Sequence, residues 1–187
     1  MRVIRHLTQV LGSLVSPISA PADHRLRPIN AIIVFVAKYF LFLSVIGVAV
    51  YWLRAARPLK FTLAWQLVVG GLIALALARI GGHFYYDTRP FVRNHVKPLF
   101  PHAPDNGFPS DHALLTSFLA YSFWRYSKPF ALALFVNALL VSAARVAAHV
   151  HSPIDIIGSF IFSLIGALVV VAIDRRLDRG RHALPRH

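Results

Sequence analysis

The chain has 187 residues, of which 57% are hydrophobic and 14% charged, and its formal net charge is +13. This composition is too apolar for an ordinary soluble domain and favours a membrane protein that crosses the bilayer several times. The absence of cysteine excludes disulfide bonds and thiolate metal sites.

The first 28 residues predict an amphipathic helix that lies on the membrane surface. Their apolar side chains recur at helical spacing, and polar residues interrupt the run before it is long enough to cross a bilayer. The apolar positions are Val3, Ile4, Leu7, Val10, Leu11 and Leu14. An uncleaved signal sequence is the alternative, because a basic start precedes an apolar stretch.

Five apolar segments follow and predict an all-α, polytopic membrane bundle of about five transmembrane helices. They span residues 30–53, 61–79, 111–126, 129–149 and 154–173. The third is short for a crossing, which needs about 20 apolar residues. We expect one membrane domain over 1–187, with the helical bundle at 29–174 and a basic tail at 175–187.

The charges of the connections predict which ends of the helices meet. Short basic connections favour the cytoplasm, so residues 54–60, 125–128 and the tail are expected on that side. The loop at 80–110, the turn at 149–153 and the N-terminus then lie together on the extracytoplasmic face. Arg89, Arg93 and Lys97 are cations on this outer side, so we expect them there for chemistry rather than for topology.

The turn near residue 151 combines a histidine with the start of a helix. Ser152 is expected to cap that helix, and Asp155 falls in its first turn at capping-box spacing. Asp155 is also one turn from His151, so its carboxylate is expected to hold that ring in one tautomer.

A second helix start follows the long loop, in the sequence FPSDH. Ser110 is its expected cap, with Asp111 and His112 in the first turn. The start of a helix presents free N–H groups and a positive partial charge, which suit a phosphate group. Ordinary capping explains each feature alone, but their order and their common side of the membrane favour a shared anion site.

Two arginines complete the predicted site. Arg89 lies in the long loop and Arg145 lies six residues before His151. One guanidinium group can bind two phosphate oxygens at once. The two arginines and two histidines together therefore indicate phosphoryl transfer, with one histidine attacking phosphorus and the other protonating the leaving oxygen. No cluster of carboxylates indicates a Mg²⁺ site, so we expect no metal and no other cofactor.

In order and spacing these residues resemble the three motifs of the type 2 phosphatidic acid phosphatase superfamily: Lys-x6-Arg-Pro, Pro-Ser-Gly-His and Ser-Arg-x5-His-x3-Asp. The chain has Arg89-Pro90, then PSDH at 109–112, then ARVAAHVHSPID at 144–155. The stretch RPFVRNHVKPLFPHAPDNGFPSDH further resembles the bacitracin-resistance type of undecaprenyl diphosphate phosphatases. The resemblance covers roughly residues 30–173.

This resemblance implies a bacterial cytoplasmic-membrane enzyme with its site on the extracytoplasmic face. Its substrate would be undecaprenyl diphosphate, a polyprenyl diphosphate lipid carrier of cell-wall synthesis that loses its terminal phosphate. The implied mechanism needs no metal and passes through a phosphohistidine. The implied roles are nucleophile for His151, orienting partner for Asp155, general acid for His112, and phosphate binding for Arg89, Arg145 and Ser110.

Three positions depart from the superfamily motifs. The motif Lys would fall at Gly82, and the motif Ser before Arg145 is Ala144. The motif Gly is Asp111, whose carboxylate is expected to hold the ring of His112 protonated. The missing cation is expected to come from Arg79, Arg93, Lys97 or Lys38.

His149 is a rival nucleophile, because the sequence HVH offers two rings. The four-residue spacing to Asp155 favours His151. Lys38 lies within an apolar segment, where a charge is a functional candidate, although its side chain is equally able to extend to the membrane surface. Three other histidines lack a comparable partner and are interpreted as loop residues near the anion: His83, His95 and His102.

Two alternatives remain open. One is a phosphatase for another lipid, such as phosphatidylglycerol phosphate, phosphatidate or lipid A. The other is a non-catalytic membrane protein that binds or transports an anion with the same cations. In each case the basic residues lie between apolar segments, so anionic lipid is the expected partner and nucleic acid is not. The sequence sets no oligomeric state.

Overall fold

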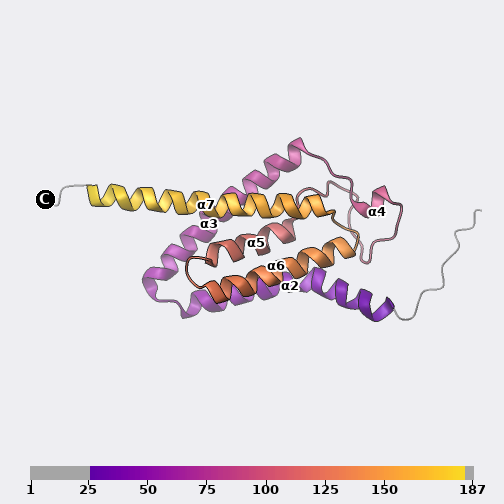
Figure 1. The fold of residues 1–187 in the computed structure, drawn as a ribbon, viewed down its shortest axis with the longest axis horizontal. Coiled ribbons are helices and arrows are strands. Elements are labelled where there is room, and N and C mark those ends of the chain that lie inside the picture. Colours follow the sequence, from indigo (N-terminus) through magenta and orange to yellow (C-terminus); the bar gives the residue numbers. More distant parts are fainter. Residues whose placement is uncertain (1–25, 184–187) are drawn as a thin grey trace, which may run out of the picture.

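The computed structural model describes residues 26–183, which form six helices and no β-strand (Figure 1). The helices are α2 (Leu26–Arg54), α3 (Arg57–Phe84), α4 (Pro90–Arg93), α5 (Asp111–Phe123), α6 (Lys128–Ala147) and α7 (Pro153–Ala183). The predicted all-α membrane bundle is confirmed. The amphipathic helix predicted for residues 1–28 lies almost wholly outside the described residues.

Within the described residues four helices, α2, α3, α6 and α7, are long and apolar enough to cross a membrane. The remaining predicted span is α5, which has 13 residues and therefore rises about 20 Å. Because the hydrocarbon core is about 30 Å thick, α5 enters the bilayer without crossing it. The bundle therefore has four spanning helices and one shorter helix where the sequence predicted about five spans.

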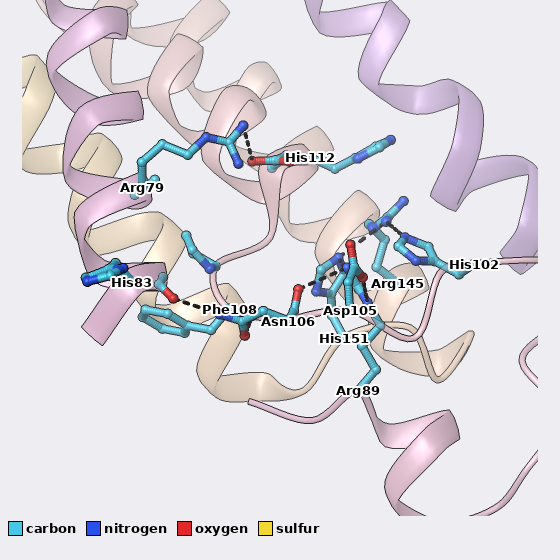
Figure 2. Close-up of a pocket in the computed structure, with 14 residues that line it drawn as sticks. Arg79, His83, Arg89, His102, Asp105, Asn106, Phe108, His112, Arg145 and His151 are labelled. Carbon is cyan, nitrogen blue, oxygen red and sulfur yellow. Dashed lines mark hydrogen bonds and ion pairs between the residues drawn. The ribbon is translucent and has the colours of Figure 1, made fainter. Parts of the chain in front are cut away.

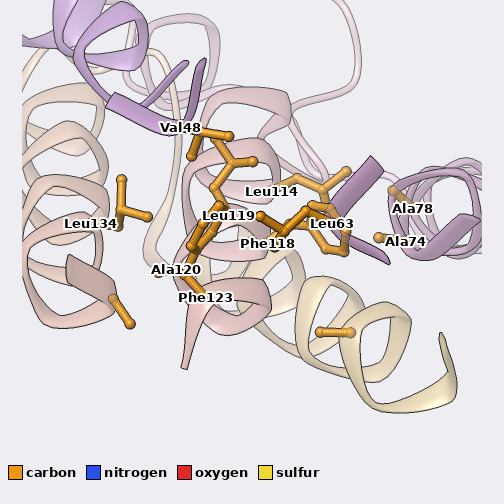
Figure 3. Close-up of a cluster of buried hydrophobic side chains, with 12 residues drawn as sticks. Val48, Leu63, Ala74, Ala78, Leu114, Phe118, Leu119, Ala120, Phe123 and Leu134 are labelled. Atoms are coloured by element: carbon orange, nitrogen blue, oxygen red, sulfur yellow. The ribbon is translucent and has the colours of Figure 1, made fainter. Parts of the chain in front are cut away.

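Helix α5 is the most enclosed helix of the bundle. It packs against α6 and α7, while α3 packs against α7 and α2 against α6. Nine of the residues of α5 are buried. Figure 3 shows Leu114, Phe118 and Phe123 of α5 in a core with Leu63 of α3 and Leu134 of α6. Apolar side chains on several sides of α5 thus hold its first turn in place.

Helices α3 and α7 approach closely where their facing residues are small. A Cβ added to Gly166 of α7 would lie 2.7 Å from the carbonyl oxygen of Gly70 and 2.8 Å from the Cβ of Ala74. Only glycine leaves room for this approach, a common arrangement between helices in membranes. The contact fixes α7 against α3, so that the start of α7 and the end of α3 lie at the same end of the bundle.

The connections gather at opposite ends of the bundle (Figure 1). The turns that follow α2 and α5 lie at one end, with the last part of α7. The loop at 85–110, the turn before α7 and the start of α2 lie at the other end, as the charge pattern predicted. We call this second end the loop end.

Two helices run further than predicted. Helix α3 continues past residue 79 to Phe84 through two glycines that pack closely on other segments. A Cβ on Gly82 would lie 2.9 Å from the carbonyl oxygen of Phe108, so contact with the loop compensates for the low helix propensity of glycine. Helix α7 continues to Ala183, into the predicted tail, because arginine and leucine favour helix there.

Candidate active site

A cavity of about 590 Å³ opens at the loop end (Figure 2). Its walls come from the end of α3, the long loop, the start of α5, the end of α6 and the turn before α7. The predicted site residues that line it are Arg79, Arg89, Asp111, His112, Arg145 and His151. The fold thus gathers into one cavity residues that lie up to 72 positions apart in the chain, from 79 to 151.

His151 lies in the wall of this cavity and is almost fully buried. Its Nδ1 is 3.0 Å from the carbonyl oxygen of Gly107 and 3.2 Å from Oδ2 of Asp155. Because a carbonyl and a carboxylate oxygen accept hydrogen bonds, Nδ1 carries the ring proton and donates it to them. Asp155 therefore contacts the ring from the position that the spacing predicted.

The other ring nitrogen of His151, Nε2, faces two guanidinium groups. It is 3.3 Å from Nη2 of Arg145 and 3.5 Å from Nη1 of Arg89. Guanidinium nitrogens donate and do not accept, so Nε2 presents its lone pair to them. Burial lowers the pKa of His151, and the two arginines lower it further against the raising effect of Asp155. The ring is neutral at neutral pH and offers a nucleophilic nitrogen.

The two helix starts differ from the predicted caps. Oδ2 of Asp155 accepts a hydrogen bond from the backbone N–H of Ser152 at 2.8 Å, which is one half of the capping box. The hydroxyl of Ser152 instead donates to Oδ2 of Asp87 at 2.5 Å and ties the turn to the long loop. At the start of α5, Ser110 makes no side-chain cap, and its buried hydroxyl has no hydrogen-bond partner. The predicted Ser110 cap is therefore wrong.

Arg89 is fixed on three sides. Its Nε donates to Oδ1 of Asp105 at 2.8 Å, its Nη1 to the carbonyl oxygen of Val150 at 2.7 Å, and its Nη2 to that of Asn106 at 3.2 Å. The side chain is 6% exposed. Because the guanidinium is already held in place, binding an anion does not cost the entropy of ordering that side chain.

Arg145 is also buried but keeps part of its hydrogen-bonding capacity unused. Its Nη1 donates to the carbonyl oxygen of Ala37 at 3.4 Å, and its Nη2 lies 3.2 Å from Nε2 of His102. Its Nε is buried without a hydrogen-bond partner. A buried, unpaired charged donor is costly, so Arg145 is poised to bind an anion beside His151.

Comparison with known proteins identifies the family. A profile of the PAP2 superfamily matches residues 63–179, more than half of the chain. The chain belongs to the PAP2 superfamily. The resemblance drawn from the three motifs is therefore confirmed, and the cavity at the loop end lies where the motif residues of this PAP2 protein meet.

The relatives of this PAP2 chain match it over most of its length. YbjG of Escherichia coli (strain K12) is 32% identical over 161 residues, which cover 83% of this chain and 78% of that protein. Undecaprenyl-diphosphatase BcrC of Bacillus subtilis (strain 168) is 26% identical over 145 residues, covering 76% and 74%. The crystal structure of Aquifex aeolicus LpxE has a TM-score of 0.63 at 20% identity, covering 78% and 87%, and it shows the same fold.

His112 stands in the PAP2 cavity without the carboxylate partner that the sequence predicted. Asp111 points to α3, where its Oδ1 is 3.9 Å from Nη2 of Arg79. Burial, and after it the positive charge of Arg145, lower the pKa of His112 to about 4. The ring is therefore neutral at neutral pH, and a bound phosphate, whose negative charge opposes these effects, is needed to raise its pKa.

This pKa predicts how kcat/KM depends on pH. Above about pH 4 we expect kcat/KM to fall as pH rises, because the free protein loses the proton on His112. We expect kcat to hold to higher pH, because bound phosphate raises the pKa of His112. Rates measured from about pH 5 to about pH 9 test this. A His112→Asn variant should lose the falling limb, and identical limbs in the two proteins would contradict the assignment.

Two further residues shape the PAP2 cavity. His102 was expected near the anion but without a partner, whereas its Nε2 contacts Arg145 and its ring lies 6.2 Å from that of His151. The side-chain amide of Asn106 bonds the carbonyl oxygens of Gly82 and Tyr85 at 2.9 and 3.1 Å. Asn106 was missed by the sequence analysis, because a Pro-rich loop signals turns but its sequence does not reveal these distant partners.

The four candidates for the missing motif cation differ in their position relative to the cavity. Arg79 lines the cavity. Arg93 lies outside its lining, and its Nη1 is 3.5 Å from Oδ1 of Asp87. Lys97 is exposed and also lies outside the lining, whereas Lys38 lies over the ring of Phe100, with Nζ 5.1 Å from the ring centroid. Of these four candidates, Arg79 therefore lines the cavity and the other three do not.

The rival histidine is placed away from the site. His149 is exposed and does not line the cavity. Its backbone has φ of 63°, and its carbonyl oxygen accepts a hydrogen bond from the N–H of Phe91. This conformation turns the chain between α6 and α7, so that two residues later His151 enters the cavity wall.

Proposed function

We propose that this protein hydrolyses undecaprenyl diphosphate to undecaprenyl phosphate and inorganic phosphate. The observation that carries the proposal is the lone pair on Nε2 of His151, which faces the guanidinium groups of Arg145 and Arg89 inside one cavity. The name of the Bacillus subtilis relative, undecaprenyl-diphosphatase, supports this choice of substrate. The charge pattern of the connections supports a cytoplasmic membrane location with the site on the extracytoplasmic face.

In the proposed mechanism Nε2 of His151 attacks the terminal phosphorus. An N–P bond forms as the P–O bond to the bridging oxygen breaks, and the lipid phosphate leaves with a proton from His112. His112 then takes a proton from water, whose oxygen attacks phosphorus and breaks the N–P bond to release inorganic phosphate. Arg145 and Arg89 stabilise the negative charge of both transition states, and Asp155 stabilises the positive charge on His151.

We also propose that the reaction requires no metal ion. The carboxylates that line the cavity support this, because Asp105 is bound to Arg89 and Asp111 is paired with Arg79. Two guanidinium groups already supply the positive charge that a metal would bring to the phosphate.

The deciding experiment is a phosphate-release assay on the purified protein with undecaprenyl diphosphate, undecaprenyl phosphate, phosphatidylglycerol phosphate and phosphatidate, each with and without EDTA. We expect the highest kcat/KM with undecaprenyl diphosphate and no loss with EDTA. A faster reaction with a diacyl substrate would overturn the substrate, and loss of activity with EDTA that added metal restores would overturn the metal-free mechanism. No phosphate release from any of the four would favour the anion-binding alternative.

A further inference from the structure

An apolar groove of about 480 Å³ lies between α3 and α5 on the outside of the bundle. The residues that form its walls and floor include Val68, Gly71, Leu72, Leu75, Leu115 and Phe118. Val68 and Leu72 are about 60% exposed, so in a membrane they face the lipid chains. The lining of the groove runs along α3 from Arg79 to Leu67, a rise of about 18 Å toward the middle of the bilayer.

The groove meets the catalytic cavity at one ion pair. Arg79 and Asp111 line both spaces. Nη2 of Arg79 and Oδ1 of Asp111 are 3.9 Å apart, and their side chains are 70% and 66% exposed. A pair this long and this exposed contributes little to stability, so an anion can readily displace Asp111 from Arg79. Figure 2 shows Arg79 on α3, well apart from the cluster of Arg89, Arg145 and His151.

We propose that this groove holds the first part of a single polyprenyl chain and that Arg79 binds the phosphate that remains on the lipid. The proposal rests on the proposed function. A diphosphate whose terminal phosphate lies beside His151 needs a second cation for its inner phosphate. Arg89 is already held by three groups of the protein. Arg79 is the cation that stands between the cavity and an apolar surface within the membrane.

The shape of the groove favours a lipid with one chain. The groove extends along α3 from the mouth marked by Arg79, and a polyprenyl phosphate has one chain to place there. A second apolar hollow, lined by Tyr51, Arg54 and Phe130 among others, lies near the turn between α2 and α3 and shares no residue with the cavity. A diacyl lipid bound at this mouth would leave one chain outside the groove.

The test fills the groove without touching the catalytic cluster. In Gly71→Leu the new Cβ would lie 3.4 and 3.8 Å from atoms of the Phe118 ring, which are ordinary contacts, and the rest of the side chain would occupy the groove. Ala76→Leu is the matched control, because Ala76 is exposed on the same helix and does not line the groove. Each protein is assayed with undecaprenyl diphosphate and with p-nitrophenyl phosphate, a soluble ester that needs only the cavity.

We expect Gly71→Leu to raise KM for undecaprenyl diphosphate about tenfold and to leave p-nitrophenyl phosphate hydrolysis unchanged, with Ala76→Leu like the parent. A second pair, Leu115→Trp on the facing wall and Leu132→Trp on α6, covers the case in which Gly71→Leu does not fold. A parent-like KM in both groove variants would overturn the groove, as would equal losses with both substrates. An inactive parent protein on undecaprenyl diphosphate would instead refute the proposed function.

The role of Arg79 is tested by Arg79→Gln against Arg93→Gln, which lies outside the cavity lining. We expect Arg79→Gln to lose about tenfold more kcat/KM with farnesyl diphosphate than with farnesyl phosphate, because only the diphosphate has an inner phosphate for Arg79 to bind. Equal losses with the two substrates, or an equal effect of Arg93→Gln, would overturn the assignment of Arg79.

Discussion

His151→Ala is expected to lower the rate of phosphate release by about 10⁴-fold or more, because it removes the attacking nitrogen itself. Within the cavity Nε2 of His151 is the ring nitrogen that faces both Arg145 and Arg89. The measurement is single-turnover and steady-state release of phosphate from undecaprenyl diphosphate by the purified variant. Its anion-binding arginines remain, so we expect orthovanadate still to raise its melting temperature.

His149→Ala is the matched control for this prediction. His149 lies two residues away but is exposed and does not line the cavity, so the variant should turn over like the parent. Rapid quenching with ³²P-labelled substrate should trap an acid-labile phosphoprotein in the parent and His149→Ala proteins but not in His151→Ala. Parent-like turnover by His151→Ala would refute the nucleophile, and a labelled His151→Ala protein would place the intermediate elsewhere.

The central contact of the site was predictable from sequence because it is local. His151 and Asp155 are four residues apart at the start of a helix, and this spacing alone brings the carboxylate to the ring. The same holds for the spans, whose length and apolar composition are fixed by the bilayer. The chemistry of these residue types then pointed to phosphate before any fold was known.

The long loop was not predictable in the same way. Its residues follow no periodic pattern, and their partners are distant: Arg89 bonds the carbonyl oxygen of Val150, 61 residues away. The sequence therefore offered Arg79, Arg93 and Lys97 as equivalent cations. It also gave no reason to choose His102 over the other loop histidines. Burial and hydrogen bonding at the loop end separate them, and both depend on how α3, α6 and α7 pack.

Helix α5 joins these two cases. The sequence showed that α5 is short but not that it is enclosed, because a short apolar stretch has the same pattern whether it faces lipid or the inside of the bundle. Enclosure by α6 and α7 places the first turn of α5, with His112, in the same cavity as His151. The unpaired hydroxyl of Ser110 then lies buried at the same helix start.

Arg145→Ala is expected to lower kcat/KM for undecaprenyl diphosphate by about 10³-fold, within the range seen when one charge-stabilising donor is removed from an active site. Arg145 brings Nη2 to 3.3 Å from Nε2 of His151 and carries a buried Nε without a protein partner. Nε and Nη2 of this one guanidinium can therefore bind two oxygens of the transferred phosphoryl group. Arg89 has no such unused nitrogen, because its Nε, Nη1 and Nη2 all donate to other groups of the protein.

Binding separates this role from that of His151. The Arg145→Ala protein should lose the rise in melting temperature that orthovanadate gives the parent, whereas His151→Ala should keep it. Arg145→Lys is the control for charge alone: an ammonium group restores the charge but not the paired hydrogen bonds, so we expect recovery of about tenfold at most. Full activity in Arg145→Lys would show that charge is sufficient, and vanadate protection of Arg145→Ala equal to that of the parent would remove Arg145 from the phosphate site.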